Sequence, residues 1–277
     1  MDRVRQLFKH NELHSLGKWI LLASLVGIVA GLGAIVFDVL GQTVTRYTLT
    51  QFAGFTPLEA AGEHARYAHV TQSLSPWILV AIMTLGGLVS GMIVFKFAPE
   101  AEGHGTDAAI DAFHNKGGRV RAIVPIVKTI ASAITLGTGG SGGREGPIAQ
   151  IGSGFGAWLG TKLKLSGRER RIMLAAGMGA GIGAIFRAPL AGAVFAGEIL
   201  YSDADLEADV IVPAAAASII AYSVYVQSLP ADVRFVPIFG AELQHKFVSP
   251  LELLAYLVLA VVLVIVGALY VRTFYGT

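Results

Sequence analysis

The sequence contains no cysteine and few charged residues. Asp, Glu, Lys and Arg make up 14% of the 277 residues, whereas hydrophobic residues make up 54%. A soluble globular domain carries about a quarter charged residues. The absence of cysteine excludes disulfide bonds and leaves the redox compartment undefined, and a net charge of only +2 disfavours nucleic acid as a partner. The composition therefore predicts a polytopic membrane protein.

The N-terminal residues Met1–Leu16 lack the apolar core and small-residue cleavage site of a signal peptide. The following stretch, Lys18–Leu40, is long enough to remain as a membrane helix. Four basic residues precede or begin this span: Arg3, Arg5, Lys9 and Lys18. By the positive-inside rule they place the N-terminus in the cytoplasm. We therefore expect a cytoplasmic segment over residues 1–17, either an interfacial helix or a solvated tail, and a membrane domain over residues 18–277.

Further apolar stretches follow, with polar segments at residues 41–75 and 227–249 between them. Their expected bounds are Pro76–Phe97, Ala122–Leu136, Ile148–Leu163, Ile172–Tyr201, Leu206–Val226 and Leu251–Tyr270. Several are too short or too broken to cross a bilayer simply, and Arg187-Ala-Pro189 divides one of them into two short helices. Such discontinuous helices are typical of transporters. The sequence therefore predicts an all-α polytopic membrane protein with tilted and broken helices.

Glu145 is the most informative charged residue. It lies in Gly139-Gly-Ser-Gly-Gly-Arg-Glu-Gly-Pro147, with mostly apolar residues on both sides. A charge at membrane depth costs roughly 2.5 to 3.5 kcal/mol or more, so it usually serves function. Irregular backbone at that depth is tolerated only where it lines a cavity or is buried in protein. The motif therefore indicates a pathway for a polar solute.

This glycine-rich turn has the chemistry of an anion site. Its glycines free backbone N–H groups to face a ligand, and the helix expected to begin near Pro147 adds a partial positive charge at its N-terminus. Glu145 can occupy the site itself, or swing away and leave it open, and protonation favours the open position. In the alternative interpretation, Arg144 and Glu145 form an ion pair that only neutralises the loop.

A second glycine turn, Gly103-His-Gly-Thr-Asp107, also follows a membrane span and precedes a short amphipathic stretch ending at His114. Thr106 or Asp107 can cap that helix. The functional interpretation aims a second helix N-terminus at the same anion, with His104 as an imidazole donor. The alternative is a simple turn and cap. The candidate anion-binding residues are therefore Gly103, His104, Gly105, Thr106, Gly143, Arg144, Glu145 and Gly146.

Two other charged residues leave alternatives open. Lys128 lies in an apolar stretch, where it either extends to the cytoplasmic edge or raises the electrostatic potential of the anion pathway. Glu198 is either an inner proton site or, as we prefer, an interfacial carboxylate at a helix end. No nucleophile–base pair or metal-ligand spacing stands out, so we expect neither an enzyme nor a metal or organic cofactor.

Other glycines have a packing interpretation. Gly137-Thr-Gly-Gly-Ser-Gly142 matches a dinucleotide-binding pattern, but no strand precedes it and no acidic residue follows at the required distance. Glycines four residues apart let helix backbones approach closely in lipid. They are Gly27 and Gly31, Gly87 and Gly91, and Gly152, Gly156 and Gly160.

Three segments together resemble one family. Gly143-Arg-Glu-Gly-Pro147, Ile151-Gly152 and Ala188-Pro-Leu-Ala-Gly192 are similar to motifs of the CLC family of chloride channels and proton/chloride antiporters. The resemblance covers about the first half of that family's membrane domain, which is one unit of an inverted repeat. It implies a homodimer with one pore per subunit, chloride as the ligand and Glu145 as the external gating glutamate. The backbone N–H groups around Arg144 to Gly146 would face the anion.

Three features depart from the family's pattern. The family's Gly-Ser-Gly-Ile-Pro segment is Gly103-His-Gly-Thr-Asp107 here, which alters the expected anion preference and pH response. The antiporters' inner proton glutamate is replaced by Ile199, which favours a passive channel. The family's second half, with a Gly-x-Phe-x-Pro segment and a pore tyrosine, is not recognisable, which indicates a fragment or one half of a split protein.

The sequence therefore predicts chloride or other anion transport across a membrane, gated by Glu145 and more passive than tightly proton-coupled. One alternative is a proton/chloride antiporter. The other is a non-transporting fragment or subunit that needs a complementary second-half polypeptide. We expect the chain in the cell (inner) membrane, with its N-terminus in the cytoplasm.

Overall fold

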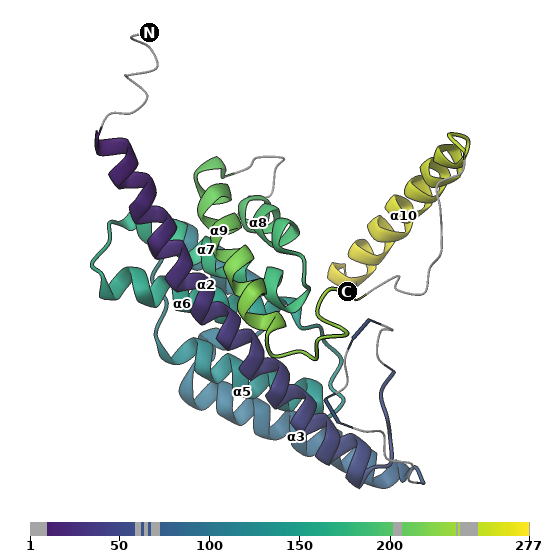
Figure 1. Ribbon diagram of the computed structural model, residues 1–277. Helices are drawn as coiled ribbons and strands as arrows, with labels where there is room; N and C mark the ends of the chain where they lie inside the picture. The colour runs from purple at the N-terminus through teal and green to yellow at the C-terminus, as the bar shows by residue number, and fades with distance from the viewer. Residues whose placement is uncertain are drawn as a thin grey trace. The chain divides into compact units, whose positions relative to one another are not determined.

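The computed structural model describes residues 10–58, 62–63, 66–67, 73–201, 207–236, 238 and 249–276, and side chains from residue 17 onward (Figure 1). The chain divides into two units, Met1–Phe239 and Gly240–Thr277, which we describe separately. The described residues form helices and turns and contain no strand. The predicted all-α class is confirmed. The expectation for residues 1–9 lies outside the described residues.

The first helix is longer than predicted. Helix α2 spans His10–Thr45 and continues as the π-helical segment η1, Arg46–Phe52. The prediction of a polar segment from residue 41 is therefore wrong for its first part. The threonines there are compatible with a helix because their hydroxyls donate to carbonyls four residues earlier. Thr43 donates to Val39 at 2.6 Å, and Thr48 donates to Val44 at 2.7 Å.

The next helices follow the predicted order. They are α3 (Pro76–Phe97), the 3₁₀ turn η2 (Pro99–Ala101), α4 (Thr106–His114), α5 (Ile123–Gly137), α6 (Glu145–Lys162), α7 (Gly167–Ile185), α8 (Pro189–Glu198) and α9 (Ala208–Val226). The predicted break at Arg187-Ala-Pro189 is confirmed, and Arg187 there has a left-handed backbone with φ of 52°. Helix α6 begins at Glu145, so Pro147 lies in its first turn as predicted. Proline fits its first turn because the N–H groups there have no intrahelical acceptor.

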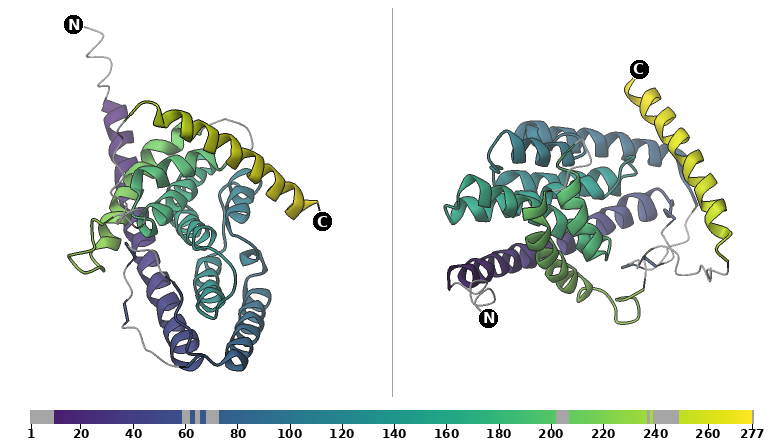
Figure 2. Two further views of the ribbon diagram at one scale, coloured as in Figure 1. Left: turned by 90° about the vertical axis from the view of Figure 1, so that its right-hand side faces the viewer. Right: turned by 90° about the horizontal axis from the view of Figure 1, so that it is seen from above.

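Helix α7 forms the centre of the first unit, and its residues from Ile172 to Ile185 are all buried. It packs against α6, α8 and α9, while α2 lies along α9 and α5 (Figures 1 and 2). The α6–α7 contact is made by backbone. A β-carbon on Gly152 would lie 2.0 Å from the carbonyl oxygen of Gly177, and one on Gly177 would lie 2.1 Å from that of Gly152. The predicted glycine packing is confirmed here.

The same packing role is confirmed for α2, whereas the described chain shows no such contact on α3. A β-carbon on Gly27 or Gly31 would meet a carbonyl oxygen of α9, that of Ala217 at 2.5 Å or of Ala221 at 2.8 Å. On α3, by contrast, a β-carbon on Gly87 would meet nothing within 4 Å in the described chain, and the same holds for Gly91. Spacing alone does not reveal which glycines face another helix.

Within the described residues, four helices are long and apolar enough to cross a membrane: α2 with η1, α3, α9 and α10 (Glu252–Tyr275). Helix α10 belongs to the second unit and extends five residues past the predicted Tyr270. Its 24 residues give a length of about 36 Å, against a bilayer hydrocarbon core of about 30 Å. Helix α5 is apolar but shorter, with 15 residues.

Candidate functional site

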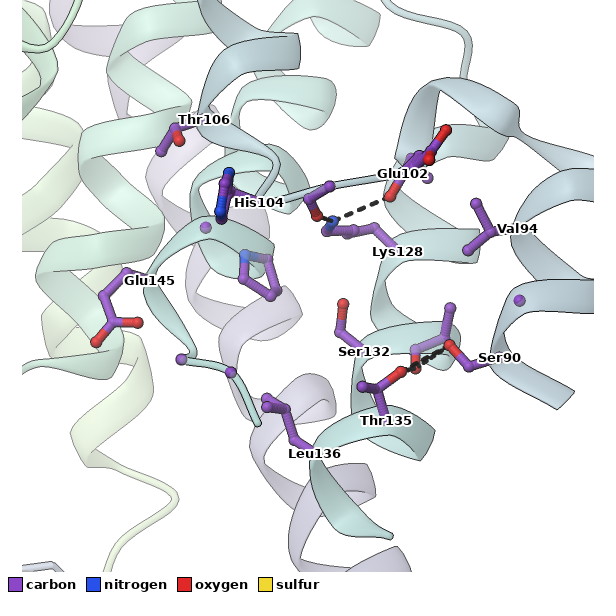
Figure 3. Close-up of a pocket in the computed structure, with 18 of the residues that line it drawn as sticks. Ser90, Val94, Glu102, His104, Thr106, Lys128, Ser132, Thr135, Leu136 and Glu145 are labelled. Carbon is purple, nitrogen blue, oxygen red and sulfur yellow. Dashed lines mark hydrogen bonds between the residues drawn. The ribbon is translucent and has the colours of Figure 1, made fainter. Parts of the chain in front are cut away.

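A cavity of about 630 Å³ lies in the first unit, among α3, α5 and the turns that precede α4 and α6 (Figure 3). We call these turns the α4 turn (residues 102–105) and the α6 turn (residues 139–144). The cavity is lined by these candidates from the sequence: Gly103, His104, Thr106, Lys128, Gly143, Glu145 and Gly146. Gly105, Arg144 and Glu198 do not line it. The structure thus brings together two turns that lie about forty residues apart in the sequence.

The α4 turn and the start of α6 touch through their backbones. A β-carbon on Gly105 would lie 2.6 Å from the carbonyl oxygen of Gly146, and one on Gly146 would lie 2.0 Å from the carbonyl oxygen of His104. Gly103 and Gly105 also have positive φ angles of 71° and 103°, which glycine adopts without strain. This contact sets the N-termini of α4 and α6 side by side. Two partial positive charges therefore converge at the cavity.

The predicted cap of α4 by Thr106 or Asp107 is wrong. Gly105 occupies the N-cap position and no side chain caps the helix. Thr106 is the first helical residue, because the left-handed glycine turns the chain directly into the helix. Asp107 lies in the first turn, where its Oδ2 is 3.6 Å from Nδ1 of His104. The imidazole of His104 is therefore paired with an acid at the edge of the cavity.

The Glu145 carboxylate lies back over its own turn. A β-carbon on Gly143 would be 1.8 Å from Oε2 of Glu145, so only glycine fits beneath this conformation. The side chain is exposed, and in Figure 3 its carboxylate points away from Lys128. Glu145 is the first residue of α6. An anionic side chain is favourable at a helix N-terminus, where the partial charge is positive.

Lys128 is buried on α5 beside the α4 turn. Only 3% of the residue is exposed, and Nζ donates to the carbonyl oxygens of Ala101 at 3.0 Å and Gly103 at 2.7 Å. The interpretation that Lys128 extends to the cytoplasmic edge is wrong, since its ammonium group points to the cavity wall (Figure 3). No carboxylate pairs with it among the described ion pairs. A buried, unpaired cation raises the electrostatic potential nearby.

Arg144 does not pair with Glu145. Its guanidinium forms an ion pair with Glu63, and its Nη1 lies 3.8 Å from Oδ1 of Asp38. The alternative interpretation, in which Arg144 and Glu145 form an ion pair, is therefore wrong. The α6 turn is neutralised by carboxylates from α2 and from the segment that follows η1, which sequence neighbours could not reveal.

The sequence interpretation missed this group of residues. We call it the Asp38 network: Asp38, Gln42, Glu63, Arg66, Arg144 and Ser228. Asp38 is only 4% exposed and accepts from Gln42 Nε2 and Arg66 Nε, each at 3.0 Å. Arg66 also donates to Ser228 Oγ at 3.2 Å. A signal was present, because Asp38 is a carboxylate inside the apolar stretch Lys18–Leu40 and such residues are rare at membrane depth.

Glu198 is separate from this cavity. It is the last residue of α8 and is exposed, while Ile199 follows it as the C-cap. The geometry agrees with the preferred interpretation of a carboxylate at a helix end. The glycines of residues 137–142 join α5 to α6, and no strand precedes them. No group of His, Asp and Glu residues that could hold a metal ion occurs in the described part of the chain.

Apolar, broken helices around this cavity define a polytopic membrane protein. The chain belongs to the voltage-gated chloride channel family, whose model matches residues 86–277, more than half of the chain. It is 30% identical over 242 residues to chloride channel protein CLC-e of Arabidopsis thaliana, covering 86% of this chain and 32% of that protein. It is 34% identical over 179 residues to the H(+)/Cl(-) exchange transporter ClcA of Cronobacter sakazakii. That match covers 64% of this chain and 35% of the transporter.

Solved structures show the same fold. A CLC-type fluoride/proton antiporter matches with a TM-score of 0.69 and 18% identity, over 91% of this chain and 56% of that one. A slow cyanobacterial Cl⁻/H⁺ antiporter matches with a TM-score of 0.60 and 21% identity, over 76% of this chain and 47% of the antiporter. The chain thus spans about a third of the length of these curated relatives and about half of these structures. The predicted family is confirmed, and so is the fold of a multi-pass membrane protein.

Proposed function

We propose that this chain carries the gate and part of the anion pathway of a CLC-type transport protein, with chloride or another small anion as substrate. The observation that carries the proposal is the backbone contact between His104 and Gly146. It joins two helix N-termini at a cavity that also holds the buried cation of Lys128. Such termini bind anions through backbone N–H groups without a full positive charge. The names of the related channel and exchangers support the same substrate.

Glu145 is the proposed gate. Its carboxylate is an anion at the same helix terminus, so it competes with the substrate for the same backbone groups. Protonation removes this competition and opens the pathway. The site residues proposed from the sequence keep this role, with the α4 turn and Gly143 to Gly146 around the anion. Arg144 contributes backbone rather than side chain, since its guanidinium pairs elsewhere.

The proposed mode of transport is proton-coupled exchange rather than the passive channel that Ile199 favours. The exchange transporters among the relatives support coupling, whereas Ile199 cannot carry a proton. A chloride gradient imposed across liposomes decides between the two modes. Proton movement at a fixed ratio to chloride supports exchange, and chloride movement without protons supports the channel.

The proposed partners and orientation are those expected from the sequence. They are a second copy of the chain in a homodimer and a separate second-half polypeptide, and the matched region is about a third of the length of the relatives. The basic residues before the first span favour a cytoplasmic N-terminus. The cell (inner) membrane is the proposed location.

Chloride efflux from liposomes tests the function. The purified chain is reconstituted alone and together with a complementary second half, and efflux is measured with a chloride electrode. Glu145→Gln should increase efflux and remove its dependence on external pH, while Asp209→Asn, a remote acid paired with Arg168, should behave as wild type. Efflux only with the second half supports a split transporter. The absence of chloride efflux in both preparations supports the alternative of a non-transporting subunit.

A further inference from the structure

Asp38 is a buried carboxylate that the proposed anion site does not use. It lies within the apolar helix α2, where Gln42 and Arg66 donate hydrogen bonds to it and Arg144 forms a longer ion pair with it. A buried ion pair offsets its desolvation cost only when further hydrogen bonds satisfy the charges, and here both carboxylate oxygens have a partner. Such an arrangement at membrane depth points to function rather than to stability alone.

The ion pair of Asp38 with Arg144, at 3.8 Å, connects it to the proposed gate. Arg144 is the N-cap residue of α6, and Glu145 is the next residue. The Arg144 guanidinium lies between Asp38 and Glu63, so two carboxylates from outside the turn hold it. Arg144 does not line the cavity, whereas its neighbours Gly143 and Glu145 do. The side chain of Arg144 is thus anchored elsewhere, while adjacent residues form the site.

The α6 turn has few other restraints. Two hydrogen bonds hold the beginning of this turn to α5. The N–H groups of Gly139 and Gly140 donate to the carbonyl oxygens of Leu136 and Thr135, respectively. In the described chain, no hydrogen bond involves Ser141, Gly142 or Gly143, and all three are exposed. Consecutive glycines do not fix the backbone by themselves, because glycine adopts many conformations. The ion pairs of Arg144 are therefore the restraint closest to Glu145 on this side.

We propose that Asp38 is a positioning residue for the gate. Through Arg144 it fixes the α6 turn against α2, so that Glu145 is presented to the α4 turn and returns to one place after each opening. The transport readout of this proposal rests on the proposed function, whereas the positioning of the turn does not. Glu63 provides the second anchor from the segment after η1.

The charges around Glu145 predict the direction of the effect. Lys128, His104 and Glu102 line the same cavity as Glu145, from α5 and the α4 turn, with Asp107 beside His104, and Arg144 precedes Glu145 in the chain. The Asp38 network adds the carboxylates of Asp38 and Glu63 and the guanidinium of Arg66, and Tyr225 of α9 interacts electrostatically with Asp38 and Arg144. Loss of the Asp38 charge leaves Arg144 and Arg66 less compensated. An ionised Glu145 is then favoured, and opening requires a lower pH.

A spin label measures the turn without any transport assay. The chain has no cysteine, so Ser141→Cys provides a single labelling site on the exposed turn. We expect Asp38→Asn to increase the label's rotational mobility about twofold or more, since the anchored turn becomes a flexible glycine segment. Asp38→Glu, which keeps the charge, should restore most of the wild-type spectrum. Asp209→Asn is the matched control and should leave the spectrum unchanged.

Flux in liposomes is the second readout. In Asp38→Asn the pH of half-maximal chloride efflux should move about one unit toward acid, the size expected from loss of a nearby charge. If Asp38→Asn fails to fold, as judged by helical circular dichroism, Glu63→Gln replaces it, because Glu63 lies outside the spans. Unchanged label mobility in the folded variant overturns the proposal, whatever the flux. Absence of flux in every sample, with increased mobility in the variant, contradicts the proposed transport of this chain and leaves the positioning role supported.

Discussion

The carbonyl oxygen of His104 lies against the α-carbon of Gly146, so closely that an added β-carbon would be 2.0 Å away. This contact joins the α4 turn to the first turn of α6, although the two lie far apart in the sequence. Both are backbone, and neither can move without shifting a helix terminus. The contact therefore defines how far apart the two helix N-termini are, which sets the geometry available to an anion.

Gly146→Ala should abolish chloride efflux in liposomes. The new β-carbon would force the His104 carbonyl away, separate the helix termini and remove the paired backbone donors. A rearrangement of packed backbone typically costs about 1–3 kcal/mol, so we also expect a lower melting temperature in detergent. Gly87→Ala is the control, because a β-carbon there meets nothing within 4 Å in the described chain. Wild-type efflux in Gly146→Ala would contradict the role of this contact.

Lys128→Met should weaken anion binding more than folding. The substitution keeps the volume of the side chain but removes the ammonium group and its hydrogen bonds to Ala101 and Gly103. The carbonyl oxygens of Ala101 and Gly103 lose a charged donor, and a buried acceptor without a donor costs about 1–3 kcal/mol of folding free energy. The desolvation cost of the buried ammonium group disappears at the same time, which offsets part of this loss. Chloride affinity by calorimetry should fall about tenfold or more, as 1.4 kcal/mol corresponds to a factor of ten. Lys96→Met, at the exposed end of α3, is the control.

The helices and the family could be predicted because they depend on local sequence. Apolar length and the break before Pro189 gave α3, α5, α7, α8 and α9 within a few residues. The Gly143-to-Pro147 motif singled out Glu145 as the candidate gate because a charged residue beside several glycines is rare among apolar segments. These signals need no knowledge of which segments meet in space.

The charge pairing could not be predicted because it depends on tertiary contacts. Arg144 has Glu145 as its sequence neighbour, yet its partners are Glu63 and Asp38. The direction of the Lys128 side chain was left open for the same reason, since a helix can present a lysine either to water or to a cavity. The extension of α2 to residue 45 was missed because threonines read as polar, although their hydroxyls bond within the helix.

Gly152→Ala should destabilise the fold itself. The added β-carbon would lie 2.0 Å from the Gly177 carbonyl oxygen, in the middle of the α6–α7 contact. Since both surfaces are backbone, the helices must separate, and we expect a loss of about 1–3 kcal/mol. Thermal unfolding in detergent, followed by circular dichroism, measures this. Gly41→Ala on α2, where a β-carbon meets nothing within 4 Å, should melt at or slightly above the wild-type temperature, and equal melting of both variants would contradict the packing argument.

The ion pair of Glu100 with Arg121 should make stability depend on pH at the acid end. Both residues lie between helices, outside the membrane spans, and Arg121 Nη2 donates to Glu100 Oε2 at 2.6 Å. This hydrogen bond lowers the pKa of Glu100 below its ordinary value of 4.5. A carboxyl whose pKa is lower in the folded state contributes stability above the unfolded pKa and loses it as the pH falls through the folded value. The contribution should therefore be complete at neutral pH and disappear below 4.5.

Melting temperatures of the wild type and of Glu100→Gln, measured in detergent from neutral to acid pH, check this expectation. The wild type should melt higher at neutral pH, and the two curves should converge as the pH falls below 4.5, because protonated Glu100 then resembles glutamine. Asp111→Asn removes another acid, paired with Lys116 on the exposed end of α4, and it separates the effect of Arg121 from general loss of surface charge. A constant difference between wild type and Glu100→Gln at every pH would show that Glu100 acts through packing rather than through its charge.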